Sequence, residues 1–202
     1  MIKNIVFDVG GVILVNATEG DVEKKLTYKE DAKIVYNELF FSEERKLMDI
    51  GTIDEEQAMG RILDRIPQRS RKEARDFFNE YMCSRIVTEG IPELLFKLRE
   101  KGLNLYILSN FGKNFNDFVK INNMDFVSDF SGVFVSSNFG LVKPQKSVYN
   151  KFAEVFGVNP KECFFVDDKK QNVLSACSCG FRGCVFKTSD HLNDSLLKHG
   201  VF

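Results

Sequence analysis

The segment from Lys3 to Leu14, KNIVFDVGGVIL, constrains the fold of this chain more than any other segment. Its first apolar run ends at Phe7 and is followed at once by a carboxylate, Asp8, and then by two glycines. A short β-branched and aromatic run closed by glycines is typical of a buried parallel strand. Asp8 is therefore predicted at the carboxyl end of a central strand, where open α/β sheets bind their ligands. Taken alone, the segment is equally compatible with an N-terminal strand followed by a turn that carries an incidental aspartate.

Length and charge exclude several classes of protein. A chain of 202 residues is long enough for one core with a modest insertion. It has 28 Lys and Arg against 29 Asp and Glu, and no basic block that would favour nucleic acid or a membrane surface as a partner. The chain opens on a strand pattern and has no apolar stretch of transmembrane length. We therefore expect no signal peptide and a cytoplasmic protein.

The five cysteines do not form a recognisable metal motif. Cys177 and Cys179 are separated by one residue, where zinc sites normally need two or more, and no histidine lies near them. We expect the cysteines to be small buried hydrophobic residues in a reducing compartment, with a metal or redox role as the alternative.

Residues from about 19 to 85 carry apolar side chains at helical spacings and no convincing strand. Two segments in this block, beginning at Ser42 and Thr52, have the hydroxyl cap and early acidic residues of helix starts. The block is long enough for about four helices of typical length. It is predicted to be an insertion after the first strand.

The pattern changes at Gly90, where strands and helices begin to alternate. Strands are predicted at 103–108, 133–136, 163–166 and 182–186, and helices at 91–101, 112–122, 145–156 and 170–179 and at the C-terminus. Such alternation predicts an α/β fold, a doubly wound parallel sheet with right-handed crossovers.

Polar residues directly follow three of the apolar strands: Asp8, then Ser109 and Asn110, then Asp167 and Asp168. The carboxyl ends of parallel strands lie at one edge of the sheet, so these side chains should meet in one crevice. Three carboxylates around one point repel each other and either bind a cation or shift their pKa values. Oxygen ligands of this kind suit Mg²⁺ with a phosphorylated substrate.

Lys143, in the loop Gly140-Leu-Val-Lys-Pro, is a further candidate, since Pro144 restricts it to an extended backbone before a helix. An aspartate that attacks phosphorus, beside a metal and a lysine that neutralise the phosphoryl oxygens, would perform phosphoryl transfer. Each group also has a plainer interpretation. Ser109-Asn110 could connect a strand to a helix, Lys143 could be a solvated loop lysine, Asp167 or Asp168 could cap a helix, and Asn172 could be exposed.

Four segments in sequence order resemble the motifs of the haloacid dehalogenase-like (HAD) superfamily of hydrolases: Asp8-Val-Gly-Gly-Val, Leu108-Ser-Asn, Gly140-Leu-Val-Lys-Pro and Val166-Asp-Asp-Lys-Lys-Gln-Asn172. The resemblance implies a Rossmann-like HAD core formed by residues 1–16 and 87–202, with an all-helical cap at 17–86. Most members with this layout are phosphatases of small molecules. The expected partner is a small phosphorylated metabolite, with neither nucleic acid nor membrane.

The resemblance also implies a role for each motif residue. Asp8 would be the nucleophile that forms an aspartyl-phosphate, and Lys143 would stabilise the charge of Asp8 and of the phosphoryl group. Ser109 would donate a hydrogen bond to a phosphoryl oxygen, assisted by the backbone of Asn110. The Mg²⁺ ligands would be Asp8, the backbone carbonyl of Gly10 and Asp168, with Asp167 and Asn172 as supporting residues.

Gly10 departs from the usual phosphatase pattern. Phosphatases of this family usually carry a second aspartate two residues after the nucleophile, which protonates the leaving oxygen, and such general acid catalysis contributes about 10²–10⁴-fold. Asp-x-Gly openings do occur in a subgroup that resembles glucose-1-phosphatase and other sugar-phosphate phosphatases. The segments from Pro92 to Gly102 and from Gly51 to Glu56 are also similar to that subgroup. A sugar phosphate with a reactive leaving group is therefore the expected substrate.

Two alternatives stay open at this level. The missing acid could mark a catalytically weak or regulatory binding protein on the same fold. A metal-independent 2-haloacid dehalogenase would use Asp8 to attack carbon, although most such enzymes carry a bulky tyrosine where this chain has Gly10, and Asp168 indicates a metal.

Overall fold

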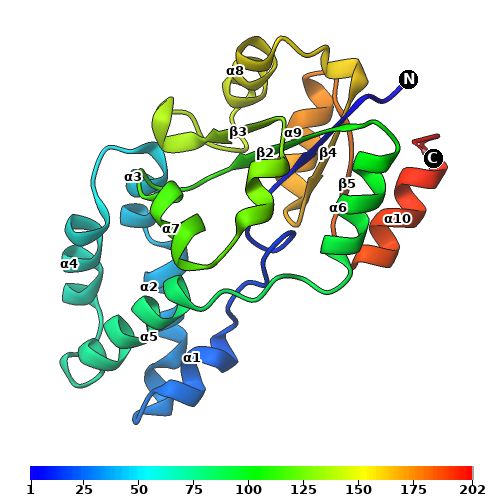
Figure 1. The fold of residues 1–202 in the computed structure, drawn as a ribbon. Helices are drawn as coiled ribbons and strands as arrows, with labels where there is room; N and C mark the ends of the chain where they lie inside the picture. Colours follow the sequence, from blue (N-terminus) through cyan, green and yellow to red (C-terminus); the bar gives the residue numbers. More distant parts are fainter. Residues whose placement is uncertain (202) are drawn as a thin grey trace.

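A parallel five-stranded sheet lies at the centre of the structure, a computed structural model that describes residues 1–201 (Figure 1). The strands are β1 (Asn4–Phe7), β2 (Asn104–Ser109), β3 (Gly132–Val135), β4 (Cys163–Asp167) and β5 (Arg182–Val185). Their order, β3-β2-β1-β4-β5, places β1 in the middle between β2 and β4. The predicted doubly wound α/β sheet is confirmed, and so is the central position of the strand that precedes Asp8.

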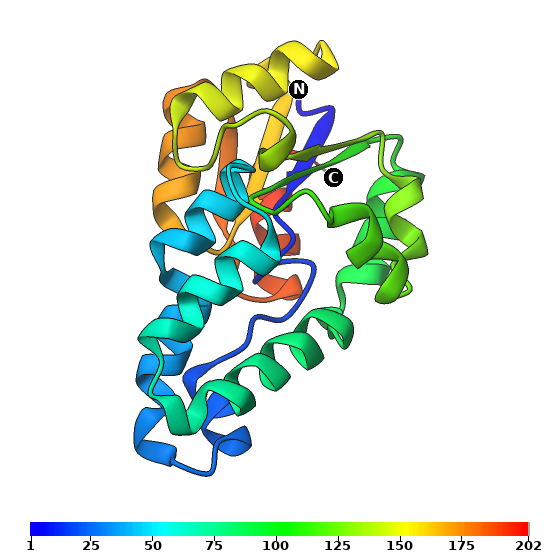
Figure 2. The same cartoon turned by 90° about the vertical axis from the view of Figure 1, so that its left-hand side faces the viewer.

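Helices cover both faces of the sheet. One face packs against α6 (Ile91–Glu100), α7 (Phe115–Ile121) and α10 (Ser189–Lys198), and the other against α8 (Lys146–Phe156) and α9 (Lys170–Ser178) (Figure 2). Successive side chains of β1 alternate between these two cores, with Ile5 and Phe7 in the first and Val6 in the second. This alternation is the period of two that a strand buried on both faces requires.

The predicted insertion is helical and forms a separate lobe beside the carboxyl ends of the strands (Figures 1 and 2). It contains α1 (Glu19–Lys25), α2 (Ala32–Phe41), α3 (Glu43–Ile50), α4 (Glu55–Arg65) and α5 (Arg71–Cys83), one helix more than the sequence suggested. We call these five helices the cap. The two chain segments that join it to the core run side by side, because the Val15 amide donates to Ile86 O and the Thr88 amide to Ile13 O, both at 2.9 Å.

Of the two predicted helix starts in the cap, one is confirmed and one is wrong. Ser42 caps α3, since its hydroxyl accepts a hydrogen bond from the Arg45 amide. Thr52 caps nothing, and α4 is capped two residues later by Asp54, whose carboxylate accepts from the Gln57 amide. The Gln57 side chain in turn accepts from the Asp54 amide, which completes a capping box and fixes the helix start at Asp54.

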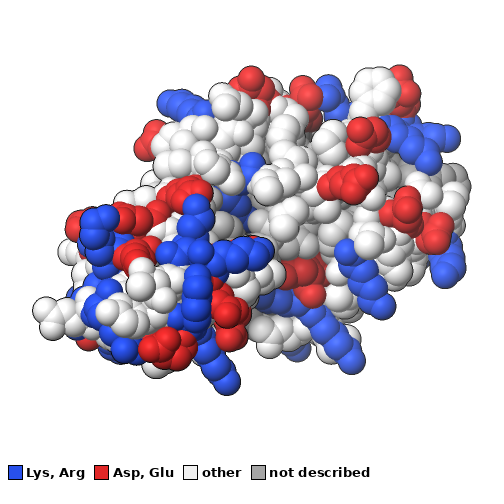
Figure 3. Space-filling model, turned by 90° about the horizontal axis from the view of Figure 1, so that it is seen from below, with Lys and Arg blue, Asp and Glu red and all other residues white. Residues whose placement is uncertain are grey.

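Three general expectations can be compared with the fold. Within residues 1–201, no helix is long and apolar enough to cross a membrane. The five cysteines all have free thiols, but only Cys163 is buried, whereas Cys83 and Cys177 are exposed and Cys179 and Cys184 half-buried, so the expectation that all five are buried is wrong. On the face seen in Figure 3, lysine and arginine side chains are interspersed with aspartate and glutamate, so this face carries no extended basic surface.

Candidate active site

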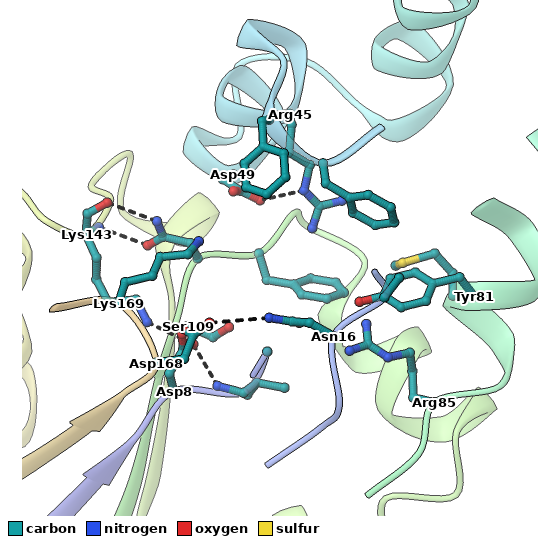
Figure 4. Close-up of a pocket in the computed structure, with 18 of the residues that line it drawn as sticks. Asp8, Asn16, Arg45, Asp49, Tyr81, Arg85, Ser109, Lys143, Asp168 and Lys169 are labelled. Atoms are coloured by element: carbon teal, nitrogen blue, oxygen red, sulfur yellow. Dashed lines mark hydrogen bonds and ion pairs between the residues drawn. The ribbon is translucent and has the colours of Figure 1, made fainter. Parts of the chain in front are cut away.

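A cavity of about 450 Å³ lies between the carboxyl ends of the strands and the cap (Figure 4). Seven of the eight residues selected from the sequence line it: Asp8, Gly10, Ser109, Asn110, Lys143, Asp168 and Asn172. The eighth, Asp167, lies directly behind the wall, with its carboxylate bonded to Lys143 and Asn172. The sheet topology thus brings together groups that are up to 164 residues apart in the sequence.

Lys143 lies between two carboxylates. Its Nζ is 2.8 Å from Asp8 Oδ1 and 2.8 Å from Asp167 Oδ2, and its side chain is only 1% exposed. Burial lowers the pKa of Lys143, but Asp167 and Asp8 together outweigh that effect and raise it. Lys143 is therefore a buried, charged ammonium group, and the plainer interpretation as a solvated loop lysine is wrong.

Negative charge exceeds positive charge around this lysine. Oxygens of Asp8, Asp167 and Asp168 lie within 4.8 Å of one another. The pKa of Asp8 is raised to about 7, mainly by burial and also by the charges of Asp167 and Asp168, while Lys143 opposes the shift. Burial, followed by the charge of Asp167, likewise raises the pKa of Asp168. The cluster therefore favours a bound cation.

Some carboxylate oxygens of these three aspartates already accept hydrogen bonds, and others are free to bind a cation. Asp167 Oδ2 accepts from Lys143 Nζ, and its Oδ1 accepts from the Lys169 amide at 2.8 Å and from Asn172 Nδ2 at 2.9 Å. Asp168 Oδ1, by contrast, is shielded from solvent and has no hydrogen-bond partner among the described residues. Asp8 and Asp168 thus have oxygens to offer a hard divalent cation such as Mg²⁺, while Asp167 orients Lys143.

Gly11 allows the chain to pass close to this cation site. Its φ is +76°, and a Cβ there would lie 2.5 Å from Asp168 Oδ2. A side chain at this position would therefore displace the Asp168 carboxylate, so the second glycine after Asp8 is required by space as well as by conformation.

The amide side chains of the motifs hold other groups in place. Asn110 Oδ1 accepts from the Lys143 amide at 2.9 Å, and its Nδ2 donates to Lys143 O at 3.1 Å, which fixes the loop that carries the lysine. Asn172 is 3% exposed and donates to both oxygens of Asp167, so its interpretation as an exposed residue is wrong. Ser109 ends β2 and is 2% exposed, with its side chain at the cavity wall.

Asn16 was not selected from the sequence, yet it lies beside the position where the usual acid is missing. A Cβ on Gly10 would lie 3.0 Å from Asn16 Oδ1, and Asn16 Nδ2 donates to Asp168 Oδ2 at 3.5 Å. The Asn16 amide therefore occupies the space next to Gly10. No motif signals this residue, because it follows a turn whose path cannot be derived from the local sequence.

The cap and the adjoining segments close the cavity with charged and aromatic groups. Arg45 and Asp49 come from α3, and Arg85 follows α5 with its guanidinium 4.0 Å from the centre of the Tyr81 ring. Much of the remaining wall is aromatic: Tyr36, Phe40, Phe41, Tyr81, Phe111 and Phe118. Sequence reasoning identified none of these cap residues, because their inward orientation depends on how the cap docks on the core.

Comparison with known proteins identifies a family model and curated relatives that match this chain. A family model described as "haloacid dehalogenase-like hydrolase" matches residues 2–180. The sesquiterpene phosphatase astK of Aspergillus oryzae is 27% identical over 195 residues, which cover 96% of this chain and 91% of that protein. Flavin mononucleotide hydrolase 1 of Arabidopsis thaliana is 27% identical over 113 residues, which cover 56% of this chain and 45% of that protein.

Solved structures show the same fold. The HAD family enzyme BT-2542 of Bacteroides thetaiotaomicron superimposes with a TM-score of 0.74 at 24% identity, covering 95% of this chain and 98% of that one. Its complex with magnesium and inorganic phosphate superimposes with a TM-score of 0.71 at 22% identity, covering 95% and 99%.

Proposed function

Because this chain belongs to the haloacid dehalogenase-like hydrolase family, we propose that it is a Mg²⁺-dependent phosphatase that cleaves a small phosphate ester through a covalent phosphate on Asp8. The observation that carries the proposal is the position of Lys143, 2.8 Å from both Asp8 and Asp167 in a buried cluster with excess negative charge. Such a lysine favours the ionised form of the nucleophile and would also supply charge to the phosphoryl group. The phosphatase relatives support the same reaction class.

The reaction would take place in two displacements at phosphorus. An Asp8 oxygen forms a bond to phosphorus while the ester P–O bond breaks, and the leaving oxygen takes up a proton. Water then attacks the same phosphorus, the Asp8–phosphate bond breaks, and inorganic phosphate is released. Lys143 and Ser109 line the cavity, and they would bind phosphoryl oxygens during both displacements.

Mg²⁺ would be held by oxygens of Asp8 and Asp168 and by the backbone carbonyl of Gly10, all of which belong to cavity residues. When bound, it supplies positive charge to the phosphoryl oxygens and compensates the excess negative charge of the three aspartates. The unpartnered Asp168 Oδ1 is the observation that fits this role.

The substrate proposed from the sequence is a sugar phosphate. A second candidate, an ester with an apolar or aromatic group, is favoured by the six aromatic side chains in the outer wall of the cavity. Aromatic walls bind flat or apolar groups through burial and stacking. The names of the two curated relatives, a sesquiterpene phosphatase and a flavin mononucleotide hydrolase, support this second candidate.

Phosphate release from a panel of esters tests both proposals. The panel contains sugar phosphates, a prenyl phosphate and flavin mononucleotide, each with Mg²⁺ and with a chelator. We expect Mg²⁺-dependent release that Asp8→Asn abolishes, and the ranking of kcat/KM decides the substrate class. Release of phosphate from none of these esters would contradict the phosphatase. A binding activity that survives Asp8→Asn would then favour the regulatory alternative. Halide release from a 2-haloacid without Mg²⁺ would favour the dehalogenase.

A further inference from the structure

The core residues next to Asp8 offer no carboxylic acid to protonate the leaving oxygen. Position 10 has no side chain, and the Asn16 amide beside it carries no acidic proton for an alkoxide. Lys143 is held between two carboxylates, and Asp168 belongs to the candidate metal site. The proposed reaction with an ordinary alcohol as leaving group therefore needs a proton donor from elsewhere in the cavity.

Asp49, in the last turn of α3, is a carboxyl group in the cap wall of that cavity (Figure 4). Its side chain is 15% exposed, and its Oδ1 is shielded from solvent without a hydrogen-bond partner in the described part of the chain. The guanidinium of Arg45 is its ion-pair partner, but Nε is 3.7 Å from Oδ1, too far for a hydrogen bond. A carboxyl oxygen that is shielded from water and lacks a hydrogen bond is costly and calls for an explanation.

Two contacts to the core fix the position of Asp49. Its backbone carbonyl accepts from Ser136 Oγ at 2.5 Å, directly after β3. Gly51 ends α3 at a φ of +84°, and a Cβ there would lie 2.6 Å from Ser137 O, so the absence of a side chain lets the helix end approach the core. The same Ser136 Oγ accepts from the Phe111 amide at 2.9 Å, two residues after Ser109. Asp49 is thereby positioned relative to the turn that follows β2.

On the basis of the proposed phosphatase function, we propose that Asp49 donates the proton to the leaving oxygen, in place of the acid that Gly10 lacks. In-line attack by Asp8 from the core side directs the leaving oxygen away from Asp8, toward the side of the cavity that the cap closes. The Asp49 carboxyl passes its proton to that oxygen as the ester bond breaks. As a carboxylate it then accepts a proton from the attacking water, which restores the starting state.

The charges around Asp49 are compatible with this role. Burial raises the pKa of Asp49, while Arg45 in the same helix and Lys169 and Lys143 from the core lower it. The balance is a raised pKa, which keeps the acid form populated closer to neutral pH than for an exposed aspartate.

The other titratable groups in the cavity are less suitable. The guanidinium groups of Arg45 and Arg85 do not release protons in proteins. The Tyr36 hydroxyl already donates to Ala17 O at 3.3 Å, and burial raises its pKa. Lys169 and Tyr81 also line the cavity. The Tyr81 ring packs against the Arg85 guanidinium, and Lys169 is the competitor that the experiment tests directly.

The experiment compares Asp49→Asn with Lys169→Met on two phosphate esters whose leaving groups differ in acidity. An alkyl phosphate needs protonation of its leaving oxygen, whereas p-nitrophenyl phosphate leaves without it. Asp49→Asn should lower kcat for the alkyl ester by about 10²-fold or more and change the aryl ester by less than about threefold. The alkaline limb of the kcat/KM profile for the alkyl ester should also disappear, and Asp49→Glu should retain part of the rate.

Three results would overturn the inference. Asp49→Asn could slow both esters equally, which a positioning role would produce, or it could slow neither. In the third result, Lys169→Met lowers kcat for the alkyl ester alone and Asp49→Asn does not. Lys169 would then be the proton donor. Thermal unfolding of each variant, compared with the wild type, shows whether the fold is intact.

The outcome also separates this inference from the proposed function. If the wild-type protein releases phosphate from neither ester, both the phosphatase function and the role of Asp49 as proton donor are contradicted. The wild type could instead release phosphate in a reaction that Asp8→Asn abolishes, while Asp49→Asn hydrolyses each ester as fast as the wild type does. That result would support the phosphatase and exclude only the role of Asp49.

Discussion

Asn16 Oδ1 lies 3.0 Å from the position that a Cβ of residue 10 would occupy, so a single amide lies next to the space left by the missing side chain of Gly10. The backbone of Gly10 lies outside the positive φ region, so a side chain there would cause no conformational strain and would crowd the Asn16 amide. The site is thus one substitution away from the usual phosphatase pattern.

Gly10→Asp should restore the rate that Asp49→Asn removes. In the Asp49→Asn background we expect the added carboxyl group to raise kcat for an alkyl phosphate by at least about tenfold, because general acids contribute about 10²–10⁴-fold when well placed. Asn16 must shift by a few tenths of an ångström, so Gly10→Asp combined with Asn16→Gly is the less crowded form. Gly10→Asn is the matched control, and an equal gain with asparagine would contradict the explanation.

Replacement of Lys143 by methionine should destabilise the protein. It leaves Asp8 and Asp167 buried without their shared counterion, and removal of one partner from a buried ion pair typically costs about 3–5 kcal/mol. Urea unfolding at neutral pH measures the loss. The double variant Lys143→Met with Asp8→Asn should recover part of it, and two additive effects would contradict coupling between the two charges.

Mg²⁺ affinity should rise with pH until Asp8 is ionised. Since burial and the neighbouring carboxylates raise the pKa of Asp8 to about 7, protons compete with the cation below that pH. We expect affinity to fall by up to about tenfold per pH unit below pH 7 and to level off above pH 8. Calorimetric titration at several pH values checks this. Equal affinity at pH 6 and pH 8 would contradict it, and Asp168→Asn should bind weakly at both.

The cap should lose a stabilising contact in acid. Asp31 accepts from Arg69 Nε at 2.9 Å, from Arg69 Nη2 at 2.8 Å and from Ser70 Oγ at 2.7 Å. These hydrogen bonds, those of Arg69 first, lower the pKa of Asp31. The contribution to stability is therefore complete above the ordinary aspartate pKa of about 4 and is lost as pH falls through the lower folded-state value.

Asp31→Asn tests this contribution directly. The variant should be less stable than the wild type at pH 7, and the difference should shrink as pH falls below about 4. Urea unfolding followed at pH 7 and pH 3 gives the two differences. A gap that stays constant between these pH values would show that the carboxylate charge is not what stabilises the contact.

The parts of the site that could be predicted are those set by strand order. Asp8 and Asp168 follow buried strands and Ser109 ends one, and parallel pairing alone brings such residues to one edge of the sheet. Asp167 and Asn172 were assigned supporting roles, and the structure gives them hydrogen bonds to each other. Whether these residues carry the proposed chemistry is a question for the variants above.

The parts that could not be predicted depend on contacts between distant segments. Asp49 faces the cavity because its carbonyl is bound by Ser136, 87 residues later, and because Gly51 fits against Ser137. Asn16 lies beside Gly10 because of the path of an irregular turn. Helical periodicity in the cap indicates which face of each helix is buried, but it does not indicate which side chains line the cavity between the cap and the core.

One hydroxyl group, that of Ser136, mechanically couples two walls of the cavity. It is bonded at once to the backbone of the turn after β2 and to the end of α3. The cap and the turn after β2 are therefore linked through a single side chain of the core. Any displacement of α3 relative to the turn after β2 would therefore have to break one of the two hydrogen bonds of the Ser136 hydroxyl.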